Sequence, residues 1–146
     1  MIKKILYGLL FVLIVIQFVR PERNVSDGNT TATFEQQYTM SADMVSVFKE
    51  SCYDCHSNNT RYPWYANIQP IGWWLQDHVK DGKGHLNFSE FTTYPEKKAK
   101  HKFEEIEEMV GEDEMPLPSY LIVHRNANLT PEQKSEIVAW AGELKK

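Results

Sequence analysis

The sequence predicts an all-α protein. No segment alternates apolar and polar residues with the period of two that a half-buried strand needs. Instead, apolar residues recur every three or four positions in several segments that also carry helix start and stop signals. The chain of 146 residues has a formal net charge of −4, so it lacks the basic excess that favours nucleic acid as a partner.

The N-terminal segment, residues 1–20, is predicted to be a transmembrane helix that acts as a signal anchor. Residues 5–19 contain no charge, and they follow Lys3 and Lys4. No small-residue cleavage site comes after them, so we expect the segment to be retained. The span is shorter than the usual ~20 residues, and lysine side chains that reach toward the headgroups would lengthen it. Residues 21–40 are polar and lack sustained apolar periodicity, which predicts a flexible linker.

The domain at 41–146 is predicted to open with two helices. Ser41 is a suitable N-cap for a helix that ends near Cys52. Pro70 begins a second helix, which we expect to stop at Asp81 and Gly82. The apolar face of this second helix is rich in tryptophan.

Three further helices are predicted in the C-terminal half. A helix opens at Pro95, places Phe103 on its apolar face and ends at Gly111. A short helix begins at Pro118. The last helix starts at Thr130 with a capping box, because Thr, Pro and Gln occupy the N-cap, N1 and N3 positions.

Residues 52–56 read Cys-Tyr-Asp-Cys-His and match C-x-x-C-H, the motif of covalent c-type haem attachment. In this motif two thiols bond one porphyrin edge, and the adjacent imidazole binds the iron. The chain has only two cysteines, so no thiol is left for a disulfide or a four-thiolate metal site. The sequence therefore predicts one covalently attached haem c, bonded to Cys52 and Cys55 with His56 as an axial ligand.

Two other readings of this motif are less favoured. A thioredoxin-like redox pair also has C-x-x-C spacing, but it needs strand-helix-strand flanks, whereas these flanks look helical. A zinc site needs two more ligands, and the spacing from His78 to His85 is too wide for a zinc-finger pair.

The order of helix, C-x-x-C-H, middle helices, Met-Pro loop and C-terminal helix resembles the cytochrome c fold. More closely, residues 40–146 are similar to the haem-binding domain family of membrane-anchored bacterial proteins. The segments that carry the resemblance are 52–57, 62–65, 72–75, 85–89, 115–116 and 119–120. This resemblance implies His56 as the proximal ligand and Met115 as the distal one.

The position of Met115 before a proline supports the same assignment. A residue before proline is held extended, so Met115 would be presented from a loop. The alternatives are His78 or His85, which would give a bis-histidine iron, or an open sixth position. Met40, Met44 and Met109 are expected to fill the core, as methionines usually do.

Several residues are candidates for the walls of the haem pocket. Arg61 is a potential partner for a propionate, and the carbonyl of Pro63 is a potential acceptor for the second N–H of His56. The candidate wall residues are Arg61, Tyr62, Pro63, Trp64, Trp74 and Tyr120. For any single aromatic residue, plain core packing is the alternative.

These observations predict a membrane-tethered monohaem electron-transfer cytochrome rather than an enzyme. Resemblance to c-type cytochromes implies a haem domain that faces the periplasm from the bacterial inner membrane, with redox proteins outside the cytoplasm as partners. The alternative is a haem-based redox or gas sensor, or a peroxidase-like accessory domain, with a weak or absent sixth ligand. A third possibility is a tethered adaptor without haem.

Overall fold

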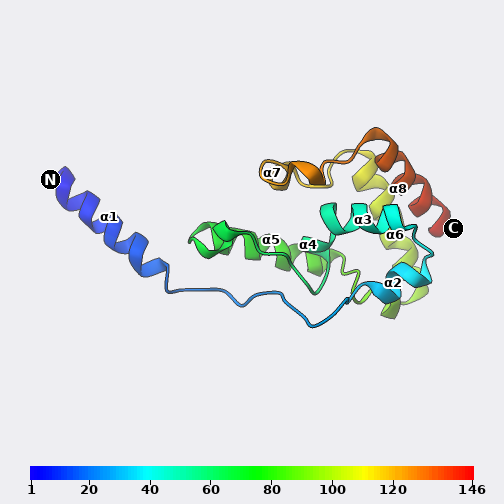
Figure 1. The fold of residues 1–146 in the computed structure, drawn as a ribbon, viewed down its shortest axis with the longest axis horizontal. Helices are drawn as coiled ribbons and strands as arrows, with labels where there is room; N and C mark the ends of the chain where they lie inside the picture. Colours follow the sequence, from blue (N-terminus) through cyan, green and yellow to red (C-terminus); the bar gives the residue numbers. More distant parts are fainter.

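The protein is entirely helical in a computed structural model that describes residues 1–146 (Figure 1). The α-helices are α1 (Ile2–Ile16), α2 (Ala32–Gln37), α3 (Ala42–Ser51), α4 (Tyr53–His56), α5 (Ile71–His85), α6 (Glu96–Gly111), α7 (Pro118–Leu121) and α8 (Pro131–Leu144). Three single 3₁₀ turns lie between them, η1 (Trp64–Asn67), η2 (Phe91–Thr93) and η3 (Arg125–Ala127). The prediction of an all-α chain is confirmed.

The helices form two packed groups. In one group α6 lies along α8, and in the other α5 packs against α4 and η1. Helix α3 contacts both α4 and α8, so it joins the two groups. Figure 1 shows α1 extending from one end of the molecule, with α6 and α8 at the other end.

An aromatic cluster forms the centre of the core. Phe34, Phe48, Phe88, Phe91 and Phe103 each expose 2% or less of their surface. Most of their rings meet at tilted or edge-to-face angles, as between Phe48 and Phe88 with 5.4 Å between centroids, and Phe88 stacks on Phe91. Burying each such side chain contributes roughly 2 kcal/mol. The cluster therefore anchors the elements on one side of the site described below.

The second half of residues 21–40, which we expected to be a flexible linker, packs against the domain. Residues Ala32–Gln37 form helix α2, and Phe34 is 1% exposed within the core. Tyr38 also packs against the cluster. Phe34 is an isolated apolar residue in a polar sequence, so its partners become visible only in the fold. Residues 31–40 are thus part of the domain.

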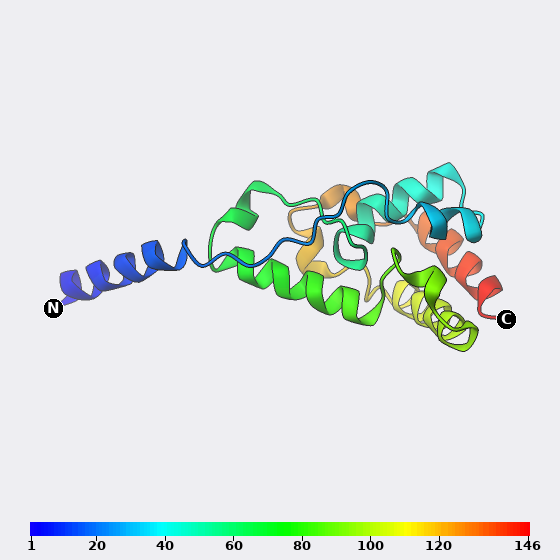
Figure 2. The same cartoon turned by 90° about the horizontal axis from the view of Figure 1, so that it is seen from below.

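The first half of that segment is also held against the domain. The Asn24 carbonyl accepts from the Thr60 amide at 2.9 Å, and Asn24 Nδ2 donates to the Ser57 carbonyl at 2.8 Å. Lys83 Nζ donates to Asn24 Oδ1 at 2.6 Å. Figure 2 shows this stretch running alongside α5 before it reaches α2. Residues 21–30 therefore form a strap that lies against the domain, rather than a free tether.

The helix predictions hold in the C-terminal half and need correction around the motif. The capping box at Thr130 is present, and α6 covers the expected segment to Gly111. The first helix ends at Ser51, in agreement with the expected end near Cys52, whereas the motif forms a separate helical turn, α4. Helix α5 continues past Gly82 to His85. The tryptophan-rich face is also not fully buried, because Trp74 is 52% exposed.

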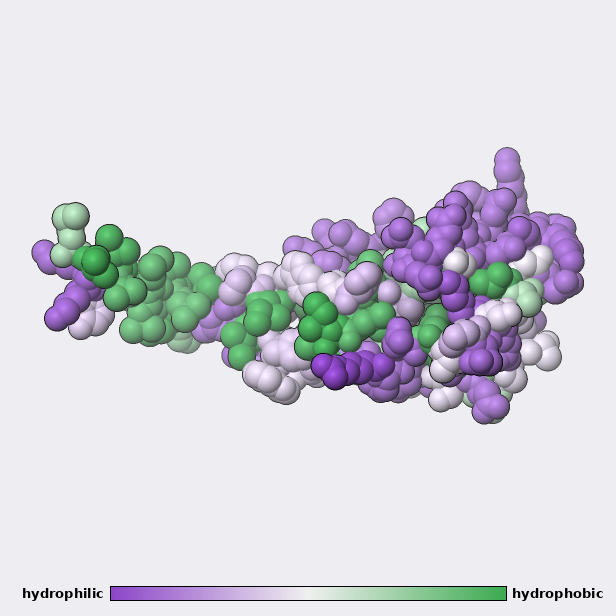
Figure 3. Space-filling view, turned by 90° about the horizontal axis from the view of Figure 1, so that it is seen from above, coloured by the Kyte–Doolittle hydropathy of each residue, from purple (hydrophilic) through white to green (hydrophobic).

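Helix α1 has 15 residues, and none of them is buried. Its apolar side chains stand out as the green projection in Figure 3. No helix in the chain reaches the length and apolar character required to cross a bilayer.

Candidate haem site

The C-x-x-C-H segment is one tight helical turn, and this turn gathers the three motif side chains. Cys52 is the N-cap of α4, and its carbonyl accepts from the His56 amide at 3.0 Å. Both cysteines are free thiols. Cys52, Cys55 and His56 all line the same cavity, so the motif forms part of the cavity wall.

This cavity has a volume of about 600 Å³ and is mostly apolar. The volume falls within the roughly 300–1,000 Å³ of ordinary cofactor and ligand pockets. Helix α6 contributes Ile106, Met109 and Val110, and the following loop contributes Met115 and Leu117. The motif, α6 and the loop after α6 thus all contribute to the wall of one largely apolar cavity.

His56 is oriented for ligation by the backbone. Its Nδ1 lies 3.0 Å from the Leu86 carbonyl, so Nδ1–H donates there and Nε2 keeps its lone pair. Burial lowers the pKa of His56, and the nearby His85 acts in the same direction, which favours the neutral ring. The acceptor is therefore Leu86. The expectation of Pro63 was wrong because α5 folds back and brings the chain after it over the imidazole.

Both thiols are kept protonated by their surroundings. Burial raises the pKa of Cys52 to about 12, and the neighbouring Cys55 adds to this effect. Burial also raises the pKa of Cys55 to about 11, with Asp54 as the second cause. Redox-active C-x-x-C pairs instead have a cysteine whose pKa is lowered. The electrostatics of this site do not fit a thioredoxin-like dithiol.

The candidate sixth ligands all line this cavity. Met115 does so from the loop after α6, with its amide donating to the Met109 carbonyl at 3.1 Å. His78 and His85 line it from α5. His78 Nδ1 lies 2.8 Å from the Trp74 carbonyl, which leaves Nε2 free in the same way as in His56. Met109, expected in the core, is 36% exposed and belongs to the cavity wall.

The other candidate wall residues are divided between several places. Tyr120 lines the main cavity. Arg61, Pro63 and Trp74 line a smaller adjoining cavity of about 70 Å³. Trp64 is 76% exposed on η1. Tyr62 lines neither cavity, and its hydroxyl donates to Gln76 at 2.6 Å.

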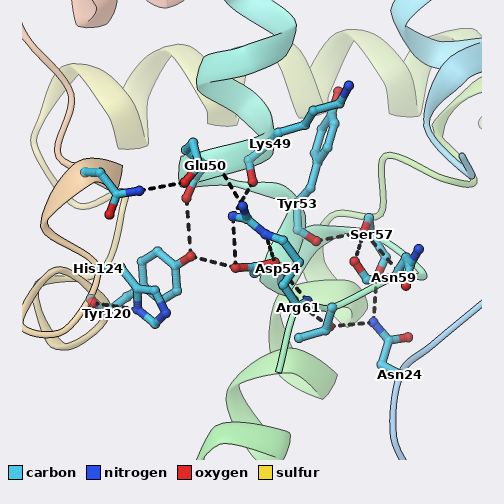
Figure 4. A network of polar contacts seen from close by, with 12 residues as sticks. Asn24, Lys49, Glu50, Tyr53, Asp54, Ser57, Asn59, Arg61, Tyr120 and His124 are labelled. Atoms are coloured by element: carbon cyan, nitrogen blue, oxygen red, sulfur yellow. Dashed lines mark hydrogen bonds and ion pairs between the residues drawn. The ribbon is translucent and has the colours of Figure 1, made fainter. Parts of the chain in front are cut away.

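Arg61 is already paired within the protein. Its Nε lies 3.1 Å from Asp54 Oδ1, and its NH1 lies 2.6 Å from Glu50 Oε1 (Figure 4). Asp54 is 7% exposed, and its carboxylate also accepts from the Tyr120 hydroxyl at 2.8 Å. Sequence reasoning missed this network. The available signal was an aspartate between the two cysteines, because a buried carboxylate needs a cationic partner.

A family model described as a haem-binding domain matches residues 11–143. The chain belongs to the haem-binding domain family. The match covers the strap and α2 as well as the globular part, in agreement with their packing on the domain. No curated protein and no solved structure matches the chain.

The cavity of this haem-binding domain fits the family's cofactor in its donor set. Two protonated thiols and one oriented imidazole lie on one wall, and the remaining lining is largely apolar. In haem sites the iron is held by histidine, methionine or cysteine side chains, and the rest of the pocket controls polarity and access. Cys52, Cys55 and His56 are the residues that would hold the group.

Proposed function

We propose that this haem-binding domain is a monohaem c-type cytochrome that carries single electrons between proteins outside the cytoplasm. The observation that carries the proposal is the placement of Cys52, Cys55 and His56 on one wall of one apolar cavity. A bound haem supplies one-electron redox chemistry at its iron. The protein is proposed as a carrier rather than an enzyme, because His56 and a second axial ligand would fill both free iron positions.

Each side chain at the site has a role that follows from its position. Cys52 and Cys55 present neutral thiols for thioether formation. His56 presents Nε2 because the Leu86 carbonyl holds its other nitrogen. The apolar side chains that include Ile106 and Val110 would limit the access of water to a haem held in the cavity.

Met115 is proposed as the sixth ligand. It lines the same cavity as His56 but comes from the loop after α6 rather than from α4, and its amide donates to the Met109 carbonyl on α6. A thioether ligand raises the reduction potential relative to a second histidine. His78 and His85 are the competing ligands, because both line the same cavity from α5.

Absorption spectra of the matured protein test the sixth ligand. We expect low-spin ferric iron with a thioether-to-iron charge-transfer band, and Met115→Ala should abolish that band and increase cyanide uptake. Met109→Ala is the matched control, because Met109 lines the same cavity and is not proposed to bind iron. A band lost only in Met109→Ala, or a bis-histidine spectrum, would overturn the assignment of Met115. High-spin iron that readily takes up CO in the unmutated protein would support a sensor.

We also propose that α1 attaches the domain to the bacterial inner membrane, with the haem site on the periplasmic side. Support comes from the exposed apolar surface of α1 and from the contact of its end with the domain, where Gln17 Nε2 donates to the Gln69 carbonyl at 3.0 Å. Exposed Trp64 and Trp74 stand on either side of Gln69 in the sequence, on η1 and α5, and tryptophan is enriched at membrane interfaces.

Cell fractionation tests this attachment. We expect the full chain to sediment with membranes after a carbonate wash, and Leu10→Arg together with Leu13→Arg to release it. Val25→Arg, at an exposed position outside α1, is the control and should leave it bound. Recovery of the unmutated chain in the soluble fraction would contradict the proposal.

A further inference from the structure

The carboxylate of Asp54 joins two walls of the haem cavity. Asp54 lies between the two cysteines on α4, and Tyr120 lies on α7 beyond the loop that carries Met115. The Tyr120 hydroxyl donates to Asp54 Oδ2 at 2.8 Å. Figure 4 shows this contact beside the guanidinium of Arg61. The same hydroxyl also lies 3.2 Å from the Glu50 carbonyl, and its shorter contact with Asp54 joins the attachment motif to α7.

Asp54 is held rigidly enough to serve as an anchor. Its Oδ1 accepts from both the backbone amide and the Nε of Arg61, each at 3.1 Å, and Oδ2 accepts from Arg61 NH2 at 3.2 Å. Asp54 is 7% exposed, and these donors, which approach both carboxylate oxygens, fix the plane of the carboxylate. Glu50 in turn pairs with Arg61 at 2.6 Å. The carboxylate that accepts from Tyr120 is thus held in place by the hydrogen bonds and ion pairs of Arg61.

The loop between Met115 and Tyr120 is short and is held at both ends. Its first end is fixed by the Met115 amide, which donates to the Met109 carbonyl at 3.1 Å. Its second end is the ring of Tyr120, which stacks on His124 with 4.0 Å between centroids. Pro116 and Pro118 restrict the backbone between these ends. Only four residues separate Met115 from Tyr120, so a displacement of Tyr120 would act on Met115 through a short, proline-restricted segment.

We propose that Asp54 is a positioning residue that closes the 115–120 loop over the haem cavity through Tyr120 and so sets the place of Met115. The proposal rests on Met115 as the sixth ligand. It means that one turn of helix both attaches the haem and places its distal ligand. It also gives a function to Asp54, the second of the two variable residues between the cysteines of C-x-x-C-H in this chain.

Tyr120→Phe in the matured protein tests the proposal, because it removes one hydroxyl and keeps the ring. We expect unchanged covalent haem content and a weaker thioether charge-transfer band. The affinity for imidazole should rise by about tenfold or more, because the variant loses a hydrogen bond to a charged group. Tyr62→Phe is the matched control. It removes a partly buried hydroxyl that donates to Gln76 at 2.6 Å and accepts from the Asn24 amide at 2.8 Å, and it should leave imidazole affinity unchanged.

A double-mutant cycle adds a second readout. If Asp54 acts through Tyr120, the Asp54→Ala and Tyr120→Phe changes together should raise imidazole affinity no more than Asp54→Ala alone. Wild-type affinity in Tyr120→Phe, alongside raised affinity in Met115→Ala, would overturn the positioning proposal and leave Met115 ligation standing. Wild-type affinity in Met115→Ala would overturn the ligation and the positioning proposal together.

Discussion

The imidazole of His56 and the backbone carbonyl of Leu86 lie 3.0 Å apart, although 30 residues of chain separate them. A second contact reinforces the first, because the His56 carbonyl accepts from the Phe88 amide at 2.8 Å. The intervening chain is largely η1 and α5, so the orientation of the imidazole depends on how closely α5 approaches the motif.

Gly82 is the position that permits this approach. A Cβ at Gly82 would lie 2.8 Å from the Cys55 carbonyl oxygen, which is closer than packed atoms allow. We expect Gly82→Ala to destabilise the domain by about 1–3 kcal/mol and to lower haem incorporation, as measured by urea unfolding and haem absorbance. Gly84→Ala is the control in the same helix, because nothing lies within 4 Å of its Cβ. It should stabilise the domain by about 0.5–1 kcal/mol. Equal effects of the two substitutions would contradict this account.

Phe34 tests whether α2 belongs to the folding unit. Truncating this 1% exposed side chain leaves a cavity in the aromatic cluster, so we expect Phe34→Ala to cost about 3–5 kcal/mol in the free energy of unfolding. Val25→Ala in the same segment should change little, since Val25 is 62% exposed. Chemical denaturation with a fluorescence readout measures both. An unaffected midpoint for Phe34→Ala would show instead that residues 21–40 are a free linker.

The raised pKa values of the two thiols predict slow alkylation in haem-free protein. The pKa of Cys55 rises from 9.0 to about 11, which lowers its thiolate fraction at pH 8 by about 100-fold relative to the unfolded chain. Iodoacetamide should therefore label the native thiols at least that much more slowly than in denaturant, as followed by mass spectrometry. Rapid native labelling at pH 8 would indicate a redox-active pair.

The same shifts determine a pH dependence of stability. Above pH 9.0 the unfolded thiols ionise while the folded ones keep their protons, so the unfolded state binds fewer protons. We expect the free energy of unfolding of haem-free protein to fall as the pH rises from about 9 toward 11, as measured by urea titration. The Cys52→Ala, Cys55→Ala double variant should lose the part of this dependence that lies between about pH 9 and 10, because the raised pKa values of buried Tyr53 and Tyr120 add a dependence of the same sign only above about pH 10. A slope that persists unchanged in that variant would assign the effect to other groups.

Local sequence signals were sufficient for much of the fold and for part of the site. The capping box at Thr130 and the apolar spacing that ends at Gly111 depend on neighbouring residues, and both helices are present. C-x-x-C-H also depends only on local spacing, and its three side chains share one cavity. Patterns of this kind need no knowledge of tertiary contacts.

The features that sequence reasoning missed depend on contacts between distant segments. Phe34 is one apolar residue in a polar stretch, and only the fold supplies its partners. Gly82 looks like a helix stop, yet it permits α5 to pass close to Cys55. Asp54 looks like a variable position in the motif until Arg61 and Tyr120 are placed beside it. No local pattern encodes these pairings.

Intact-mass spectrometry of the chain matured in a cytochrome-producing bacterium tests the central claim most directly. We predict a mass increase equal to one haem that survives acid and acetone, and that disappears in the Cys52→Ala, Cys55→Ala double variant. A matured chain whose two sulfurs are both unmodified would contradict covalent attachment and the electron-carrier function built on it.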